Sequence, residues 1–434
     1  MLWIVGDVSD ARSRSFFMSL LREKRETVQF LQVTVELPEM LEEMRATMLR
    51  KAPNLETLRV RILRPRIYKL VALYDDNPRI LFDNVAPKLR HFELDLVLSF
   101  NPNASWISNL RSIEFSSHYS APFILSVLQS TPFLTTLLVR RTGSGVVQPA
   151  ATDSEHENIA SFDIHLPRLR YLYLGGQHFL DVYLFLKLIK PSPGCILGVS
   201  KIRGVEAHMG DTSTNTLLEN LYGEMVKWAS AYINLHRPKS AYLSMDYPIF
   251  QSIPSVQIGC TKDEFGVPES SLSLQFTLCS YGYNAIQQLA TCSGLSAVRD
   301  LDLSSVPQIE DPLFPLYRAF SSVTKLTVVR CCPDLVGAFH IEDSQPQSQF
   351  PIFPLLYNFR PVSAGEPSPW LDFDYTHYIL DFLEYRAGVG LPILSLDLSY
   401  CRHTVLTFGE ENWSRIASRA LGVKATLPDY CLSL

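Results

Sequence analysis

The sequence predicts an α/β solenoid, a fold in which short repeats, each with one strand, stack side by side. Three observations predict it. An apolar pattern with the spacing i, i+3 and i+5 recurs along the chain, its copies follow one another at similar intervals, and amphipathic segments separate them. The 434 residues suffice for a large core, and a repeat array grows by stacking instead of adding separate domains.

The pattern is clearest at residues 166–176, LPRLRYLYLGG, where leucines stand at Leu169, Leu172 and Leu174. Neither the period of a helix nor that of a strand accounts for the whole spacing. The last two apolar positions alternate along a short strand that faces the core, and the first closes the preceding bend. We call these three positions the kernel. Further kernels begin at Phe30, Leu55, Leu89, Leu110, Leu134, Val298, Val323 and Ile393, and a degenerate one begins at Leu356, with Pro361 in place of the last apolar residue.

The intervals between kernels identify the type of repeat. Kernels that begin at residues 89 and 110 are 21 residues apart, and those at 298 and 323 are 25 apart. Leucine-rich repeats have a period of about 20–29 residues, and longer intervals here contain insertions. We therefore expect a curved leucine-rich-repeat solenoid over residues 27–424, with parallel strands on the concave face and helices and irregular coils on the convex face. Residues 1–26 are predicted to be an N-terminal helical segment, and residues 425–434 a C-terminal tail.

Two segments between kernels have the apolar stripe of a helix that packs on a sheet. Residues 120–131 offer Ser120 as an N-terminal cap and Pro122 in the first turn, both of which favour helix initiation. Residues 181–190 show a similar stripe and stop before Pro191, which cannot continue a helix. Strands and helices are therefore expected to alternate.

Two later segments differ in how well their sequences fit a helix. Residues 376–390 predict a helix, with Thr376 as its cap and Gly388 in the left-handed position that often ends a helix. Residues 311–320 contain Pro315, and this proline is expected to limit them to a broken turn.

Residues 195–290 fit the repeat poorly. They predict an amphipathic helix over 217–233 and an alternating strand over 272–278. Strands without a kernel are predicted at Ala241–Met245 and Val256–Ile258. Two interpretations stay open, degenerate repeats with insertions or a separate small domain.

Composition narrows the environment of the protein. A formal net charge of −5 gives no general attraction to nucleic acid or to anionic membranes. No window approaches the roughly 20 apolar residues of a membrane helix, and the first ten residues lack a basic leader. The eight cysteines form no CxxC pair, so neither a disulfide framework nor a metal site is expected. We predict a cytoplasmic or nuclear protein without a cofactor.

The candidate binding residues follow from strand alternation. If kernel side chains point inward, their neighbours point outward along the concave face. Charges of both signs and two tyrosines occur there, which suits a protein or peptide partner, since interfaces are enriched in aromatic residues and arginine. The outward candidates are Arg59, Arg61, His91, Glu93, Asp95, Glu114, Arg140, Tyr171, Tyr173, Asp300, Asp302, Lys325, Arg360 and Asp397.

Two other functions were weighed. The basic run Arg59–Lys69 has the charge for nucleic-acid contact, but a solvated edge balanced by Glu39–Glu43 is the favoured interpretation. No Walker loop, GxGxxG, GxSxG or HExxH motif occurs. The carboxylates Asp372 and Asp374 beside His377 precede a predicted helix, where acids are favoured by the helix dipole alone. We therefore expect a protein that is not an enzyme.

Several motifs together resemble one family. These are PNLETLRV and PRLRYLYL, an Arg-Ala-Gly helix end before LPILSLDLSYC, and the N-terminal LWIVGDVSDARSRSFFMSLLREKR. The chain resembles the C-terminal region of the fungal F-box-like leucine-rich-repeat proteins. In that family a Leu-Trp pair ends the F-box and a helix follows, which would be Leu2-Trp3 and Ser15–Glu23 here.

The resemblance implies the substrate receptor of a cullin-RING ubiquitin ligase. In such receptors the F-box binds the Skp adaptor and the repeats capture the protein to be ubiquitylated. This sequence contains no F-box, so a Skp partner is expected only if an F-box is supplied upstream. The alternative is a free-standing leucine-rich-repeat scaffold or ligand-binding protein with no link to ubiquitin.

Overall fold

The computed structural model describes residues 1–36, 40–62, 80–95, 100–116, 119–140, 162–205, 212–246, 255–261, 272–306, 313–329, 352–362, 376–399 and 424–426. The chain forms two compact units, Met1–Glu224 and Met225–Leu434. Each contains a sheet that is wholly or mostly parallel, together with helices. The predicted α/β class is thereby confirmed.

The first unit has a parallel sheet whose strands are hydrogen-bonded in chain order. They are β1 (Leu2–Val8), β2 (Val28–Val35), β3 (Thr57–Ile62), β4 (His91–Leu94), β5 (Ser112–Phe115), β6 (Thr136–Arg140), β8 (Tyr171–Gly175) and β10 (Ile196–Ser200). A separate parallel pair consists of β7 (Ile164–Leu166) and β9 (Ile189–Pro191). Parallel neighbours need a connection that crosses back over the sheet, and the connecting segments supply it.

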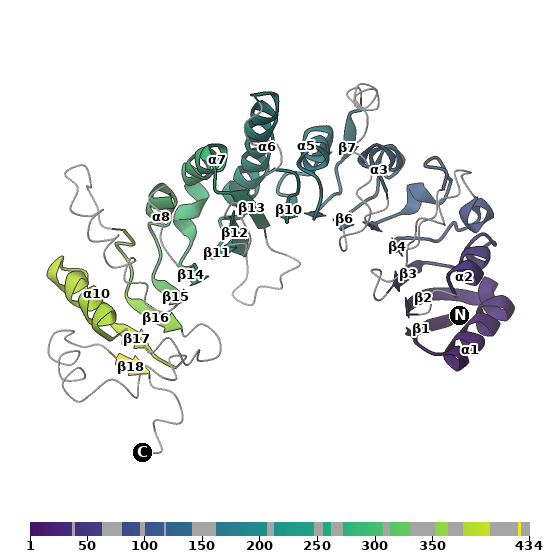
Figure 1. Cartoon of the computed structure of the whole chain (residues 1–434), viewed down its shortest axis with the longest axis horizontal. Coiled ribbons are helices and arrows are strands. Elements are labelled where there is room, and N and C mark those ends of the chain that lie inside the picture. Colours follow the sequence, from purple (N-terminus) through teal and green to yellow (C-terminus); the bar gives the residue numbers. More distant parts are fainter. Residues whose placement is uncertain are drawn as a thin grey trace, which may run out of the picture. The chain divides into compact units, whose positions relative to one another are not determined.

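Helices and short turns form these connections in the first unit. The helices are α1 (Ala11–Lys24), α2 (Met40–Met48), α3 (Ala121–Leu128) and α5 (Phe179–Leu188), with 3-10 turns η1 (Arg25–Thr27), η4 (Leu81–Asn84) and η5 (Ile107–Asn109). Figure 1 shows α3 and α5 on the same side of the sheet, near the strands β6 and β10. Helix α6 (Thr212–His236) contains the boundary between the units.

The kernel side chains form the buried side of the strands. In the kernel at Leu134, the three side chains of Leu134, Leu137 and Val139 are at most 1% exposed. Leu137 is in register with Ile113 on β5 and with Leu172 on β8, so each kernel packs beside the next. Every described side chain of the kernels that begin at residues 55, 89, 110, 134, 169, 298, 323 and 393 is at most 3% exposed.

The predicted kernel at Phe30 is wrong by two residues. The register pairs Leu31 with Leu58 and Val33 with Val60, and Phe30 with the outward-facing Thr57. The buried kernel is therefore Val28, Leu31 and Val33, each at most 2% exposed.

Residues 1–26 differ from the predicted helical segment. Leu2 and Trp3 lie in β1, which pairs with β2 and so extends the sheet. The predicted helix Ser15–Glu23 lies inside α1, whose N-terminal cap is Asp10, accepting hydrogen bonds from the backbone of Arg12 and Ser13.

The second unit has a sheet with antiparallel and parallel parts. In order, its strands are β13 (Leu272–Thr277), β12 (Ser255–Thr261), β11 (Ser240–Asp246), β14 (Asp300–Ser305), β15 (Lys325–Val329), β16 (Asn358–Val362), β17 (Ser395–Asp397) and β18 (Lys424–Thr426). Strands β11, β12 and β13 are antiparallel neighbours, and from β11 through β14 to β18 every pairing is parallel. Its other helical elements are α7 (Ser280–Ala290), α8 (Phe314–Ala319), α10 (Thr376–Gly388) and the 3-10 turn η8 (Ser293–Ala297).

The region 195–290 therefore contributes β10, α6, β11, β12, β13 and α7. The strands predicted at 241–245, 256–258 and 272–278 and the helix at 217–233 are confirmed. The absence of a kernel from β11 to β13 has a physical reason, since the strands of an antiparallel meander need no crossover connection.

The helix predictions hold with local corrections. Ser120 caps α3 by accepting a hydrogen bond from Phe123 N. Helix α5 begins two residues earlier than predicted, and the segment after it forms β9. Residues 314–319 form a helix because Pro315 stands in its first turn, where a proline costs no hydrogen bond.

The helix α10 ends differently from the prediction. Gly388 is its last helical residue, and Gly390, with φ of +76°, takes the left-handed position instead. Within the described residues, no helix combines the length and apolar character that a membrane crossing requires.

Candidate functional site

The outward side chains of the first unit form rows across its sheet. We use the name strand face for the outward side chains of β3, β4, β5, β6, β8 and β10. The register places Thr57 and Arg59 of β3 beside His91 and Glu93 of β4. The central row runs Arg59, Glu93, Glu114, Leu138, Tyr173 and Gly198.

Glu93 is the electrostatic centre of this row. The residue is 6% exposed, although it points away from the kernel side chains. Arg61 donates a hydrogen bond from its Nε to Glu93 Oε1, and Arg59 Nε lies 3.7 Å from Glu93 Oε2. A buried carboxylate is tolerated when charged donors surround it, so the two arginines of β3 explain why Glu93 can lie low on the sheet.

Asp95 follows directly after β4 and closes the end of β3. Its Oδ2 accepts a hydrogen bond from the backbone N–H of Ile62 at 3.1 Å. Burial raises the pKa of the Asp95 carboxyl, and this hydrogen bond opposes the rise. Asp95 therefore binds a backbone group of the neighbouring strand β3, and it also contributes a negative charge beside Glu93.

Glu114 of the central row pairs with Arg140, which lies two residues after Leu138 on β6. Arg140 Nε lies 3.3 Å from Glu114 Oε1, and the Arg140 guanidinium lies 5.5 Å from the centre of the Tyr173 ring. Burial and then the charge of Glu93 raise the pKa of Glu114 above its ordinary value of 4.5. Arg140 thus bridges a carboxylate and an aromatic ring.

Tyr173 lies flat on the sheet because two glycines leave room for it. A Cβ atom on Gly198 would lie 2.7 Å from Tyr173 Cδ2, and one on Gly175 would lie 2.7 Å from Cε1. The hydroxyl shares a hydrogen bond of 2.8 Å with Ser200 Oγ. The ring is therefore held in place before any partner arrives, which lowers the entropy lost on binding.

Tyr171 and His91 belong to the neighbouring row. Tyr171 is half-buried and in register with Thr136 and Ile196. His91 is half-buried, and burial followed by the charge of Arg59 lowers its imidazole pKa below 6.5. His91 is consequently neutral at pH 7.

Fewer of the predicted binding residues lie in the second unit than in the first. Arg360 Nε lies 3.4 Å from Asp397 Oδ2, across the β16–β17 pair. Asp300 is in register with Lys325. Asp302 accepts a hydrogen bond of 2.7 Å from the backbone of Ser304. The opposite charges of this unit thus also stand on adjacent strands.

Sequence reasoning missed Tyr242 in the second unit. Its ring lies across Gly259 on β12, where an added Cβ would lie 2.0 Å from Tyr242 Cε1. Its hydroxyl is 3.4 Å from Ser273 Oγ, to which Gln257 also donates at 2.6 Å. Glycine opposite tyrosine on the adjacent strand, as for Gly198 and Tyr173, is the signal that could have identified both.

The basic run Arg59–Lys69 was predicted to be balanced by Glu39–Glu43, but its two described arginines have a different ion-pair partner. Arg59 and Arg61 pair with Glu93. Glu43 instead pairs with Arg14 at 3.3 Å and Arg22 at 3.8 Å. Arg64, Arg66 and Lys69 lie outside the described residues, as do Glu39, Asp372 and Asp374, and the side chain of His377 is not described.

The described cysteines Cys195, Cys260, Cys279 and Cys292 are free. Burial raises the pKa of the Cys195 and Cys260 thiols to about 12, which keeps them protonated at neutral pH. The described part of the chain brings no three His, Cys, Asp or Glu side chains together for a metal ion.

No family model matches the chain, and no curated protein matches its sequence. The function must therefore be argued from the residues and their geometry. The strand face offers paired charges, oriented donors and a fixed aromatic ring, which together can recognise another polypeptide.

Proposed function

We propose that the chain is a leucine-rich-repeat solenoid whose strand face binds a protein or an extended peptide without catalysing a reaction. Two findings support the repeat architecture. Kernel side chains of successive parallel strands are in register and buried, and helices or short turns connect the strands. Coils of this kind cannot bury their apolar side alone, so stacking completes one core.

The observation that carries the binding function is the row from Arg59 to Tyr173. Its charges are already paired within the sheet, through Glu93 and Glu114, and its aromatic ring is fixed. Such a row offers a partner guanidinium donors and an aromatic surface whose positions are set in advance. Arginine and tyrosine are the residue types enriched at the energetic centres of interfaces.

The partner is best matched by a chain of mixed charge. Along the strand face the charge is positive at Arg59, negative at Glu93 and Glu114, and positive again at Arg140, so the face both attracts and repels a uniform polyanion. Nucleic acid binding instead depends on a continuous set of phosphate contacts. A peptide with acidic and basic residues in alternation can exchange ion pairs with this row.

Photo-crosslinking tests this function. A benzophenone amino acid placed at Thr136 on the strand face is expected to give a covalent adduct with a cellular protein, and the same residue at Ser108 on η5 is not. A double variant, Arg59→Gln with Arg140→Gln, is expected to lower the Thr136 adduct at least tenfold. The matched control, Arg12→Gln with Lys187→Gln on α1 and α5, removes two cations away from the strands and should leave it unchanged. Equal adducts from Thr136 and Ser108 would refute the proposal.

The ligase role is the finer part of the proposal. It is supported by the resemblance of the kernel motifs to F-box-like leucine-rich-repeat proteins. Co-purification of the Skp adaptor with the protein expressed from its native transcript tests it. Absence of the adaptor, combined with a positive crosslink at Thr136, would favour the free-standing scaffold or ligand-binding protein.

A further inference from the structure

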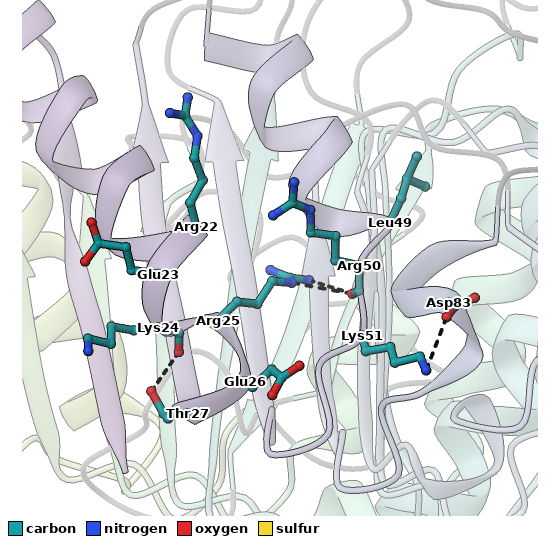
Figure 2. Close-up of a pocket in the computed structure, with 10 residues that line it drawn as sticks. All are labelled: Arg22, Glu23, Lys24, Arg25, Glu26, Thr27, Leu49, Arg50, Lys51 and Asp83. Carbon is teal, nitrogen blue, oxygen red and sulfur yellow. Dashed lines mark hydrogen bonds and ion pairs between the residues drawn. The ribbon is translucent and has the colours of Figure 1, made fainter.

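A pocket of about 650 Å³ opens in the first unit, away from the strand-face residues. Its walls come from the end of α1 and from η1, from the segment that follows α2, and from Asp83 in η4. Figure 2 shows the side chains of Arg22, Arg25 and Arg50 in this pocket, with Lys51 near Asp83. All of these segments precede strands, so the pocket lies at the edge of the sheet where β2, β3 and β4 begin.

Arg25 is the deepest cation of the pocket, with 7% of the residue exposed. Its Nε and Nη2 both donate to the backbone carbonyl of Arg50 at 3.4 Å, and its guanidinium lies 5.9 Å from the centre of the Phe82 ring. No carboxylate within the described ranges pairs with it. A buried cation without a counter-ion is costly, so this position demands an explanation.

Arg50 adds a second positive charge to the pocket. Burial and the positive charge of Arg50 lower the pKa of the Arg25 guanidinium to about 10. Among the described groups, the Arg50 side chain is exposed and has no hydrogen bond or ion pair. The lining of this one pocket therefore contains two arginines that have no carboxylate partner among the described residues.

Two of the three acidic side chains that line the pocket, Asp83 and Glu23, have partners other than its arginines. Asp83 pairs with Lys51 at 3.8 Å, and Glu23 accepts a hydrogen bond from Ser19 at 3.3 Å. The lining contains five basic residues, Arg22, Lys24, Arg25, Arg50 and Lys51, against three acidic ones, Glu23, Glu26 and Asp83. The difference, five minus three, is a net charge of +2.

A structural role explains only part of this arrangement. Basic residues favour the C-terminal end of a helix, which accounts for Arg22 and Lys24 in the last turn of α1. The hydrogen bonds of Arg25 satisfy one carbonyl after α2. Neither role requires a second arginine in the lining of the same pocket, whereas several arginine donors together can hold an oxyanion through more than one hydrogen bond.

We propose that this pocket binds a phosphate group, with Arg25 and Arg50 as its hydrogen-bond donors. A phosphomonoester carries about −1.5 to −2 charges at pH 7, which matches the net charge of +2 in the lining. The volume exceeds that of one phosphate and leaves space for the molecule that bears it. Lys24 adds a further positive charge to the lining, whereas Arg22 pairs with Glu43 at 3.8 Å and Lys51 pairs with Asp83.

Calorimetry with the full chain and inorganic phosphate tests the proposal at constant ionic strength, with chloride as the comparison ion. Saturable binding of phosphate and a rise in melting temperature are expected. Arg25→Gln and Arg50→Gln should each weaken phosphate binding at least tenfold. Arg168→Gln is the matched control, because Arg168 is an exposed arginine of the same unit that stacks on Phe133 at 4.8 Å, and it should bind phosphate like the unchanged chain.

Two further comparisons complete the experiment. A peptide with one phosphoserine, set against its unphosphorylated form and against inorganic phosphate, distinguishes a phosphorylated side chain from a free phosphate as the source of the group. If Arg25→Gln does not fold, phosphate binding by Arg50→Gln, a variant at an exposed position, tests the proposal alone. Phosphate binding no stronger than chloride binding, or equal in Arg50→Gln and Arg168→Gln, would overturn the proposal.

Discussion

Arg140 and Tyr173, on the adjacent strands β6 and β8, form a cation–π pair in which the tyrosine ring lies across Gly175 and Gly198. The arrangement joins the charged part of the strand face to its aromatic part. It depends on backbone without side chains beneath the ring, so the glycines are as much a part of the site as the tyrosine. This relationship yields a direct test.

Gly198→Ala is expected to destabilise the first unit by about 1–3 kcal/mol, the usual cost of an added methyl in a filled space. The new Cβ would lie 2.7 Å from Tyr173 Cδ2, and the hydrogen bond of the Tyr173 hydroxyl with Ser200 opposes a movement of the ring. In a Tyr173→Ala background, Gly198→Ala should cost much less, because the ring is gone. Urea unfolding of the four proteins measures this coupling. An equal cost in both backgrounds would show that the ring does not lie on Gly198.

Two adjacent leucines on β6 test the stacked core. Leu137 is fully buried and Leu138 is half-buried on the strand face. Leu137→Ala is expected to lower the free energy of unfolding by about 2–5 kcal/mol, since it leaves a cavity between neighbouring kernels. Leu138→Ala removes the same atoms from the outward side and should cost less than about 1 kcal/mol. Similar losses for both leucines, measured by urea unfolding, would contradict the inward and outward assignment.

A buried arginine connects α10 to the segments on either side of it. Arg386, 2% exposed, donates to the carbonyls of Ile352, Leu356 and Leu391 at 3.1–3.2 Å. Arg386→Met keeps the length of the side chain but leaves these carbonyls without that donor. Each buried acceptor that loses its partner costs about 1–3 kcal/mol, so a loss of about 3 kcal/mol or more is expected by thermal unfolding. Arg299→Met, at an exposed position before β14, should be nearly neutral. A neutral Arg386→Met would show that water replaces the guanidinium.

The kernels could be predicted from sequence because burial there is nearly complete and the chemistry of each position is therefore restricted. At Leu137 or Leu172, with 0% exposure, few residue types fit. The error at Phe30 arose because β2 carries apolar residues at both sets of positions, Val28, Leu31 and Val33 inside and Phe30 outside. A pattern of apolar residues alone cannot decide the register in such a strand.

The candidate sites were less predictable for a different reason. The outward positions of Glu93 and Arg140 followed from alternation, but the pairing of Glu93 with Arg59 and of Arg140 with Glu114 depends on the register between strands 21 to 34 residues apart in sequence. The phosphate pocket joins Arg25, Arg50 and Asp83 from three separate turns. No local spacing relates these residues, and only the stacking of the strands brings their turns together.

The last prediction concerns the pH dependence of stability through Glu114. Burial, and next the charge of Glu93, raise its pKa in the folded chain above the ordinary value of 4.5. Between these two pKa values the folded chain binds more protons than the unfolded chain, so stability falls as pH rises through this window. The ionised Glu114 thus costs stability at pH 7, in spite of its ion pair with Arg140.

Glu114→Gln removes this titration. The free energy of unfolding of the variant, relative to the unchanged chain, is therefore expected to increase between pH 4 and pH 7, whatever the sign of the difference at pH 4. Urea unfolding at each pH measures the change, and carbon-detected NMR of the side chain should place the midpoint of Glu114 above 4.5. Ser112→Ala, on the same strand and without a titrating group, should give a difference that does not vary with pH. A difference for Glu114→Gln that stays constant or declines would mean that the Arg140 ion pair outweighs burial, and that the strand face carries its negative charge at no cost to folding.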